Sequence, residues 1–257
     1  MTLDDVVISE AIVESFFNDF KNNLRHQVSI AGAGPAGLTA GYYLAKEKIK
    51  VVIFEKNLRV GGGMPGGGIM FNKIVVQEPA RKILDEMEIR YFPYQPGYYV
   101  ADSLEAISCL TLKALRAGVK IFNLMGVEDV MVKNSEVKGL VINWESVRMA
   151  NLHVDPIAVS CDAAIDATGH GCEVVAKLEK RGNIKLNTST GKIMGEGPMW
   201  AEKGEEAIIE CTKEVFPGLY VSGMSANAVF GAPRMGPVFG GMMLSGKKVA
   251  GMILQTL

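Results

Sequence analysis

Three side chains of this sequence have the chemistry of metal ligands. The chain contains only three histidines, and His170 stands just beyond the predicted parallel strand 163–169, where open α/β sheets bind ligands. Pro156 favours an extended backbone before it, and residues two apart in an extended segment share a face, so His153 and Asp155 should project together. Two imidazoles and one carboxylate with open positions predict a non-haem iron(II) site. Each histidine could equally be an isolated, hydrogen-bonded residue, and both interpretations remain open.

A lone arginine stands in an apolar segment rich in glycine and proline. This is Arg234, within residues 227–243. A guanidinium stays charged and prefers a carboxylate or phosphate that accepts two hydrogen bonds. Arg234 is therefore a candidate for binding the carboxylate of a substrate, and a structural ion pair with one of the chain's own acids is the equal alternative.

A glycine-rich turn predicts a dinucleotide site between these residues. An apolar strand runs directly into the pattern Gly-x-Gly-x-x-Gly, followed by a helix that begins near Pro35. In such a turn Gly32 makes the tight bend, Gly34 lets the backbone approach a pyrophosphate, and Gly37 allows close packing of helix on strand. The free N–H groups of the helix N-terminus, Ala36 among them, face the phosphates.

An acidic residue ends the second strand of this predicted βαβ unit, which covers residues 27–56. Glu55 stands about 20 residues after the glycine turn, where a carboxylate accepts ribose hydroxyls and repels a 2′-phosphate. NAD or FAD is therefore favoured over NADP. The glycine-rich loop 61–68 follows and is too flexible for the core, so it is either a surface linker or a loop that folds over the nucleotide.

The remaining pattern predicts an α/β protein with a Rossmann-like dinucleotide-binding fold and a small antiparallel β layer. We expect one domain over residues 1–257, with an N-terminal helix at about 9–25 that starts at Ser9 and carries an apolar stripe suited to docking on another subunit. Further predicted elements are helices 79–87 and 103–117, strand 119–123, a hairpin layer at about 127–144, and the C-terminal sheet return and substrate loop at about 160–257.

This order resembles that of flavoproteins with two dinucleotide-binding domains. In those proteins the last strand typically ends in Gly-Asp, and the aspartate holds the flavin ribityl and phosphate region. Here Gly223 is followed by Met224. The departure favours NAD or an NAD-derived nucleotide over bound FAD.

Composition excludes several classes of protein. A net charge of −1 provides no basic surface for nucleic acid or an anionic membrane, and no apolar run approaches the roughly 20 residues that span a bilayer. The N-terminus lacks the pattern of a signal peptide, and the four cysteines form no Cys-x-x-Cys pair. We therefore expect a cytoplasmic protein with idle thiols that binds neither nucleic acid nor membrane.

Taken together, these segments resemble the thiamine thiazole synthase family over nearly the whole chain. The matching parts are Gly32–Gly37, Glu55-Lys56, the loop 61–68, Asn143-Trp144, His153-Val-Asp-Pro156, Thr168-Gly-His170 and Pro233-Arg-Met-Gly-Pro237. The resemblance implies an enzyme of the transferase class that builds the adenylated thiazole carboxylate precursor of thiamine. It implies NAD as the carbon substrate, glycine and a sulfur source as co-substrates, iron(II), and a homo-oligomer (an octamer) with active sites shared between adjacent protomers.

The resemblance also assigns roles to single residues. It implies Asp155 and His170 as iron ligands and Arg234 as the residue that binds the glycine carboxylate. It implies His153 as a catalytic acid or base, a residue lining the nucleotide, or a further iron ligand. The implied nucleotide contacts are Ala36, Glu55, Lys56, Gly63, Val127, His153, Val154, Asp155 and Met224.

Position 153 decides the expected source of sulfur. Eukaryotic members of the family carry Cys-Met-Asp-Pro there, and that cysteine gives up its sulfur in a single turnover. This chain has histidine and resembles the archaeal branch, which uses free sulfide and turns over repeatedly. The alternatives are an FAD-dependent oxidoreductase, which flavin absorbance would reveal, and a ribose-bisphosphate isomerase, which a direct assay would reveal.

Overall fold

The central element of the fold is a six-stranded sheet with the order β11-β12-β10-β1-β2-β6. The computed structural model describes residues 2–182 and 184–257. The strands of this sheet are β1 (Val28–Ala31), β2 (Val51–Glu55), β6 (Lys120–Asn123), β10 (Ala163–Asp166), β11 (Glu214–Phe216) and β12 (Leu219–Val221). All pair in parallel except β11, which runs antiparallel to β12. The predicted α/β fold class is confirmed.

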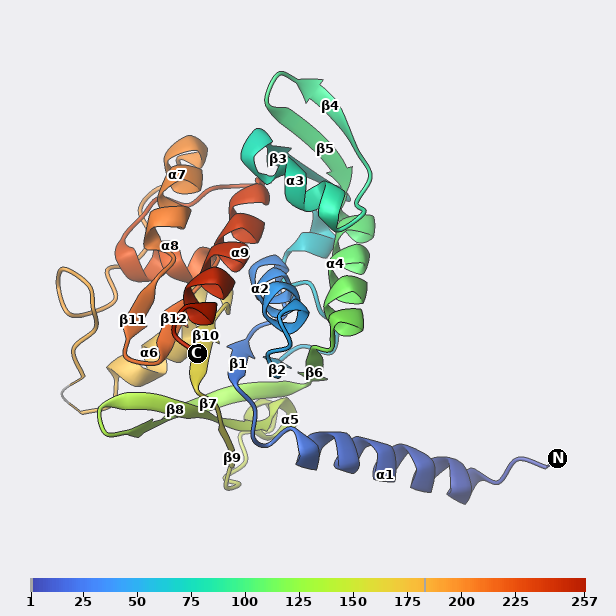
Figure 1. The fold of residues 1–257 in the computed structure, drawn as a ribbon. Helices are drawn as coiled ribbons and strands as arrows, with labels where there is room; N and C mark the ends of the chain where they lie inside the picture. Colours follow the sequence, from blue (N-terminus) through green and yellow to red (C-terminus); the bar gives the residue numbers. More distant parts are fainter. Residues whose placement is uncertain (1, 183) are drawn as a thin grey trace.

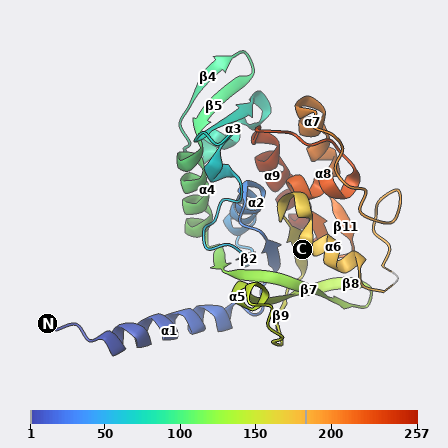
Figure 2. The same ribbon diagram turned by 180° about the vertical axis from the view of Figure 1, so that it is seen from behind.

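Both faces of this sheet are covered, because successive side chains of a strand point to opposite faces. Val51 and Ile53 of β2 pack against the helices of one face, whereas Val52 and Phe54 pack into a second core on the other. Figures 1 and 2 show the four helices that cover the face of Val51 and Ile53, and these helices lie close together. These helices are α2 (Pro35–Lys46), α3 (Glu78–Glu86), α4 (Ser103–Ala117) and α9 (Gly240–Leu254).

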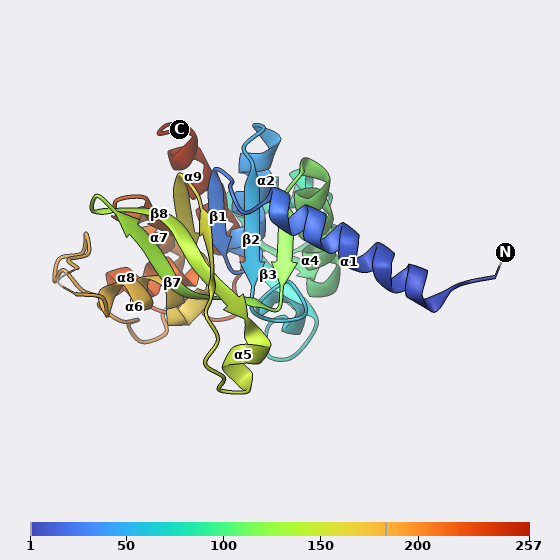
Figure 3. The ribbon, with the colours of Figure 1, turned by 90° about the horizontal axis from the view of Figure 1, so that it is seen from below.

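The opposite face carries the predicted antiparallel layer. Its strands β7 (Met125–Lys133) and β8 (Glu136–Trp144) form the hairpin around Asn134 and Ser135, and β9 (Ile157–Ser160) adds a third strand. The hairpin begins two residues before the predicted 127. The short helix α5 (Glu145–Met149) follows β8 at the edge of this layer (Figure 3).

The N-terminal helix α1 spans Asp5–Asn22 and projects from the body of the molecule (Figures 1 and 3). The predicted start at Ser9 is wrong, because the Asp4 carboxylate caps the helix by accepting the N–H groups of Val6 and Val7. Phe20 is buried and its ring lies 5.2 Å from that of Phe122, whereas Ile12, Val13 and Phe17 are exposed. Only part of the apolar stripe is therefore used within this chain.

A second antiparallel sheet was not predicted from the sequence. It has the order β3-β5-β4 and consists of β3 (Lys73–Gln77), β4 (Tyr91–Gln95) and β5 (Tyr98–Asp102). It projects beside α3 at the top of Figure 1. The Pro96-Gly97 turn between two aromatic runs, with Gly97 at φ +82°, is the sequence signal that could have revealed this hairpin.

The C-terminal part adds three helices and closes the side of the sheet beyond β10. These helices are α6 (Glu173–Glu179), α7 (Ala201–Cys211) and α8 (Met224–Phe230). Two 3₁₀ turns, η1 (Met64–Gly66) and η2 (Gly169–Gly171), stand in the loops after β2 and β10. None of the helices in the described ranges is long and apolar enough to cross a membrane.

Candidate active site

A pocket of about 740 Å³ opens at the carboxyl ends of four parallel strands. The residues that follow β1, β2, β10 and β12 all line it. From β1 the chain first adds β2 and β6 on one side of β1, and it later adds β10 and β12 on the other side. The pocket therefore lies at the topological switch point of the sheet, the usual ligand site of open α/β folds.

The glycine turn forms one wall of this pocket. Gly32 has φ +99°, and a Cβ there would lie 2.5 Å from the carbonyl oxygen of Ala167. A Cβ on Gly37 would clash with the carbonyl oxygen of Gly32, whereas one on Gly34 would meet no atom within 4 Å. Gly32 and Gly37 are thus required by packing, and Gly34 borders the open space of the pocket.

Glu55 lies at the floor of the pocket and is only 4% exposed. Its Oε2 accepts the N–H of Ala33 at 2.8 Å, and its Oε1 accepts the backbone N–H and the side-chain amide of Asn57 at 2.8 and 2.7 Å. A carboxylate offers about four acceptor positions. Three are used by the protein, so one position on Oε2 is left for a ligand hydroxyl.

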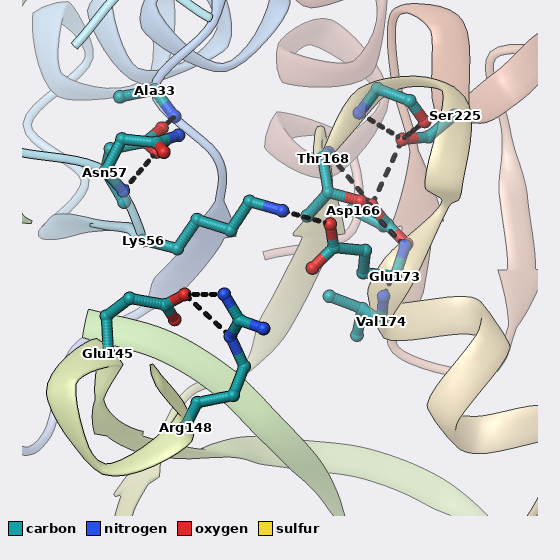
Figure 4. A network of polar contacts seen from close by, with 12 residues as sticks. Ala33, Lys56, Asn57, Glu145, Arg148, Asp166, Thr168, Glu173, Val174 and Ser225 are labelled. Atoms are coloured by element: carbon teal, nitrogen blue, oxygen red, sulfur yellow. Dashed lines mark hydrogen bonds and ion pairs between the residues drawn. The ribbon is translucent and has the colours of Figure 1, made fainter. Parts of the chain in front are cut away.

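Other predicted nucleotide contacts also line the pocket. They are Ala36, Lys56, Gly63, Val127 and Met224. Lys56 reaches across the opening to Glu173, with Nζ 2.5 Å from Oε1 (Figure 4). The prediction that the loop 61–68 stays out of the core is wrong, because Met64 within η1 is fully buried in the core.

The far wall carries His170 and Arg234, and a residue that the sequence reading missed lies between them. His170 Nδ1 is 2.6 Å from Glu196 Oε1, and Arg234 Nε is 3.7 Å from Glu196 Oε2. His170 and Arg234 line the pocket. The ion pair that was the alternative for Arg234 is thus present, and Arg234 also faces the ligand space.

A buried carboxylate positions the turn that bears His170. Asp166 ends β10 and accepts hydrogen bonds from Thr168, from Ser225, and from the N–H groups of Val174 and Val175 at the start of α6 (Figure 4). Burial raises the pKa of Asp166, and these hydrogen bonds oppose that shift. The sequence signal that could have predicted this positioning role is an aspartate at the end of a buried strand.

The segment with His153, Val154 and Asp155 lies elsewhere. It forms an exposed loop between α5 and β9, and Asn143 Nδ2 donates to the carbonyl oxygen of Val154 at 3.1 Å. None of the three residues lines the pocket, and the described residues contain no group of three or more metal-binding side chains. The expected convergence of His153 and Asp155 with His170 does not occur within one chain.

The four cysteines lie outside the pocket. Cys172 is nearest in sequence to His170, and its pKa is raised to about 12, first by burial and then by the charges of carboxylates such as Asp166 and Glu179. Burial likewise raises the pKa of Cys161 to about 11. These thiols are poor sources of thiolate.

Comparison with known proteins adds to this geometry. The profile of the Thi4 family matches residues 9–239. The chain is 58% identical to the thiamine thiazole synthase of Methanothermobacter thermautotrophicus over 100% of both chains. It is 60% identical to that of Pyrococcus furiosus over 99% of both. The crystal structure of Thermovibrio ammonificans THI4 superposes with a TM-score of 0.98 at 51% identity over 99% of both chains.

Proposed function

Because the chain belongs to the Thi4 family of thiamine thiazole synthases, we propose that it makes the adenylated thiazole carboxylate from NAD, glycine and free sulfide with iron(II), over many turnovers. One observation carries this proposal. A single pocket brings the glycine turn and Glu55 together with His170 and Arg234, and none of the chain's cysteines lines it.

The glycine turn and Glu55 would bind NAD. The pyrophosphate would lie against Gly34 and the first turn of α2, where backbone N–H groups and the helix dipole favour an anion. The adenosine ribose would donate to the free acceptor position of Glu55, and Lys56, Gly63, Val127 and Met224 would border the nucleotide. This placement directs the nicotinamide end toward His170 and Arg234.

Arg234 would bind the carboxylate of glycine. Water would replace nicotinamide at the ribose, giving ADP-ribose and free nicotinamide, and the ADP-ribose ring opens to a carbonyl compound. The glycine amine would condense with that carbonyl to form an imine and release water. The guanidinium can hold the carboxylate with two parallel hydrogen bonds. It thereby orients the amine toward the sugar, which is the entropic contribution expected of a positioning contact.

The residues of the far wall suit a ferrous ion in one respect. Glu196 accepts the Nδ1–H of His170, which leaves Nε2 as the ligand atom, and metal-binding histidines commonly have such a carboxylate partner. Asp155 of the same chain lies outside the pocket, so it would join the site from an adjacent protomer. Bound there, iron(II) would supply a Lewis acid with open positions for soft ligands such as sulfide.

The same loop would bring His153 to the site. At a shared site, His153 would be the candidate acid or base for the proton transfers of cyclisation and aromatisation. Sulfur would come from solution, because position 153 carries no thiol and the buried cysteines have raised pKa values. We propose a cytoplasmic homo-oligomer as the working form.

The product identifies the reaction. The chain would be incubated without oxygen with NAD, ¹³C-labelled glycine, iron(II) and sulfide, and the small molecules released by denaturation would be analysed by mass spectrometry. We expect an adenylated thiazole carboxylate that carries the glycine label. Product without that label, or none when all four components are present, would contradict the proposal.

A further inference from the structure

Glu196 is placed between the two pocket residues that the proposed reaction assigns to different substrates. One carboxylate oxygen lies 2.6 Å from His170 Nδ1, and the other lies 3.7 Å from Arg234 Nε. Its side chain is 14% exposed, whereas those of His170 and Arg234 are 52% and 57% exposed. Glu196 therefore supports both residues from behind the ligand space.

The backbone on both sides of Glu196 is tied to the segment that bears Arg234. The N–H of Gly195 donates to Ala228 and that of Gly197 to Ala232, each at 3.0 Å. The N–H of Arg234 donates back to Gly197 at 3.3 Å. The backbone that carries the Glu196 side chain is consequently anchored to the segment that bears Arg234.

The hydrogen bond orients the His170 ring, and the longer ion pair draws the Arg234 guanidinium toward Glu196. A carboxylate only accepts hydrogen bonds, so His170 must donate from Nδ1, and its Nε2 lone pair remains available to a metal. The contact at Arg234 engages Nε. Within the described residues, its terminal nitrogens have no hydrogen-bond partner, which leaves them for a ligand carboxylate.

We propose that Glu196 is a positioning residue that prepares His170 for the metal and Arg234 for glycine. This inference rests on the proposed function and deepens it, because it links two binding events through one side chain. Neither event requires Glu196 to touch a substrate, and Glu196 does not line the pocket.

Two substitutions separate its two contacts. Glu196→Ala removes both, so we expect iron(II) affinity to fall by about 10- to 100-fold and the KM for glycine to rise by about two- to fivefold, the effect of an ion pair to an exposed guanidinium. Glu196→Gln keeps an oxygen that accepts the Nδ1–H of His170 but has no charge for Arg234. It should restore iron(II) affinity to within about threefold of wild type while the KM for glycine stays raised.

The metal is measured without turnover, by anaerobic calorimetric titration of each chain with iron(II) alone. Affinity for ADP-ribose and the melting temperature report nucleotide binding and folding, and both should match wild type in the Gln variant. Glu202→Ala, an exposed glutamate in the first turn of α7, is the matched control and should change no measurement.

The possible results distinguish the inference from the function it rests on. Wild-type chain that binds no iron(II) and makes no thiazole would overturn both. Normal wild-type behaviour with unchanged iron(II) affinity and glycine KM in both Glu196 variants would overturn the positioning role alone. Equal loss of iron(II), glycine and ADP-ribose binding in the Gln variant would assign Glu196 a purely structural role and would also overturn it.

Discussion

Replacement of Glu55 by glutamine tests how the pocket selects its nucleotide. Three of the four acceptor positions of Glu55 are occupied by Ala33 and Asn57, at 2.7 to 2.8 Å. One position on Oε2 is left, and Glu55 lines the pocket. In Glu55→Gln the amide oxygen can satisfy Asn57, but the NH₂ group then opposes the Ala33 N–H and cannot accept from a ribose hydroxyl.

The expected magnitude follows from these contacts. A hydrogen bond to a charged group contributes about 1.5–3 kcal/mol, which corresponds to roughly a 10- to 150-fold loss of affinity for ADP-ribose. A 2′-phosphate at about 4 Å from the wild-type carboxylate would be repelled by about 4 kcal/mol per unit charge at an effective dielectric constant near 20. Glutamine removes that repulsion, so the preference for ADP-ribose over its 2′-phosphate should fall at least about tenfold.

Calorimetric titration with ADP-ribose and 2′-phospho-ADP-ribose measures this change without consuming NAD. The matched control is Glu173→Gln, which lies across the pocket opening and pairs with Lys56. Glu173→Gln should preserve the preference for ADP-ribose over its 2′-phosphate, because this variant removes a charge from the pocket opening and leaves Glu55 intact. Equal binding of both ligands by the wild-type chain, or an unchanged preference in Glu55→Gln, would refute the assignment.

Three further outcomes are expected. Arg234→Ala should still release nicotinamide from NAD, but its KM for glycine should rise about 100-fold or more, because a bidentate charged contact is lost. A wild-type KM in steady-state kinetics with varied glycine would refute this. His170→Ala and Asp155→Ala should each abolish calorimetric binding of iron(II) and leave ADP-ribose affinity within about threefold, and undiminished iron(II) binding would exclude them as ligands. Burial lowers the pKa of His26 from 6.5 to about 4, so the stability from its neutral form is present above pH 6.5 and is lost as pH falls toward 4, by about 3 kcal/mol. Urea unfolding across that range should show a smaller acid loss in His26→Asn than in wild type, and equal losses would contradict the shift.

Local patterns predicted the glycine turn and the terminal acid that line the pocket. The order of strand, glycine turn, helix and terminal acid is a short-range signal, and the contacts of Gly32 and Gly37 with Ala167 and with each other explain why glycine is needed there. Helix α4 was predicted with its observed bounds because its hydrophobic period is regular and Asp102 caps it. These features depend on residues close in sequence or on one packing contact.

The other half of the site depends on long-range pairing. Glu196 contacts His170 and Arg234 only because its segment pairs with residues 228–234. No sequence motif around Glu196 predicts that pairing. Asp166 has one such distant partner, Ser225 of α8, whereas Thr168, Val174 and Val175 follow it within nine residues. His153 and Asp155 were expected at the site on chemical grounds, but α5 and β9 hold their loop away from the pocket of the same chain.

Tracing the source of the product's sulfur is the most direct test of the proposed reaction. The chain, iron(II), NAD, glycine and ³⁴S-labelled sulfide would be combined without oxygen, and both the product and the intact protein would be measured by mass spectrometry. We expect more than one labelled thiazole per chain and an unchanged protein mass, because no cysteine lines the pocket. Unlabelled sulfur in the product, with a protein that has lost the mass of one H₂S, would contradict the proposed reaction.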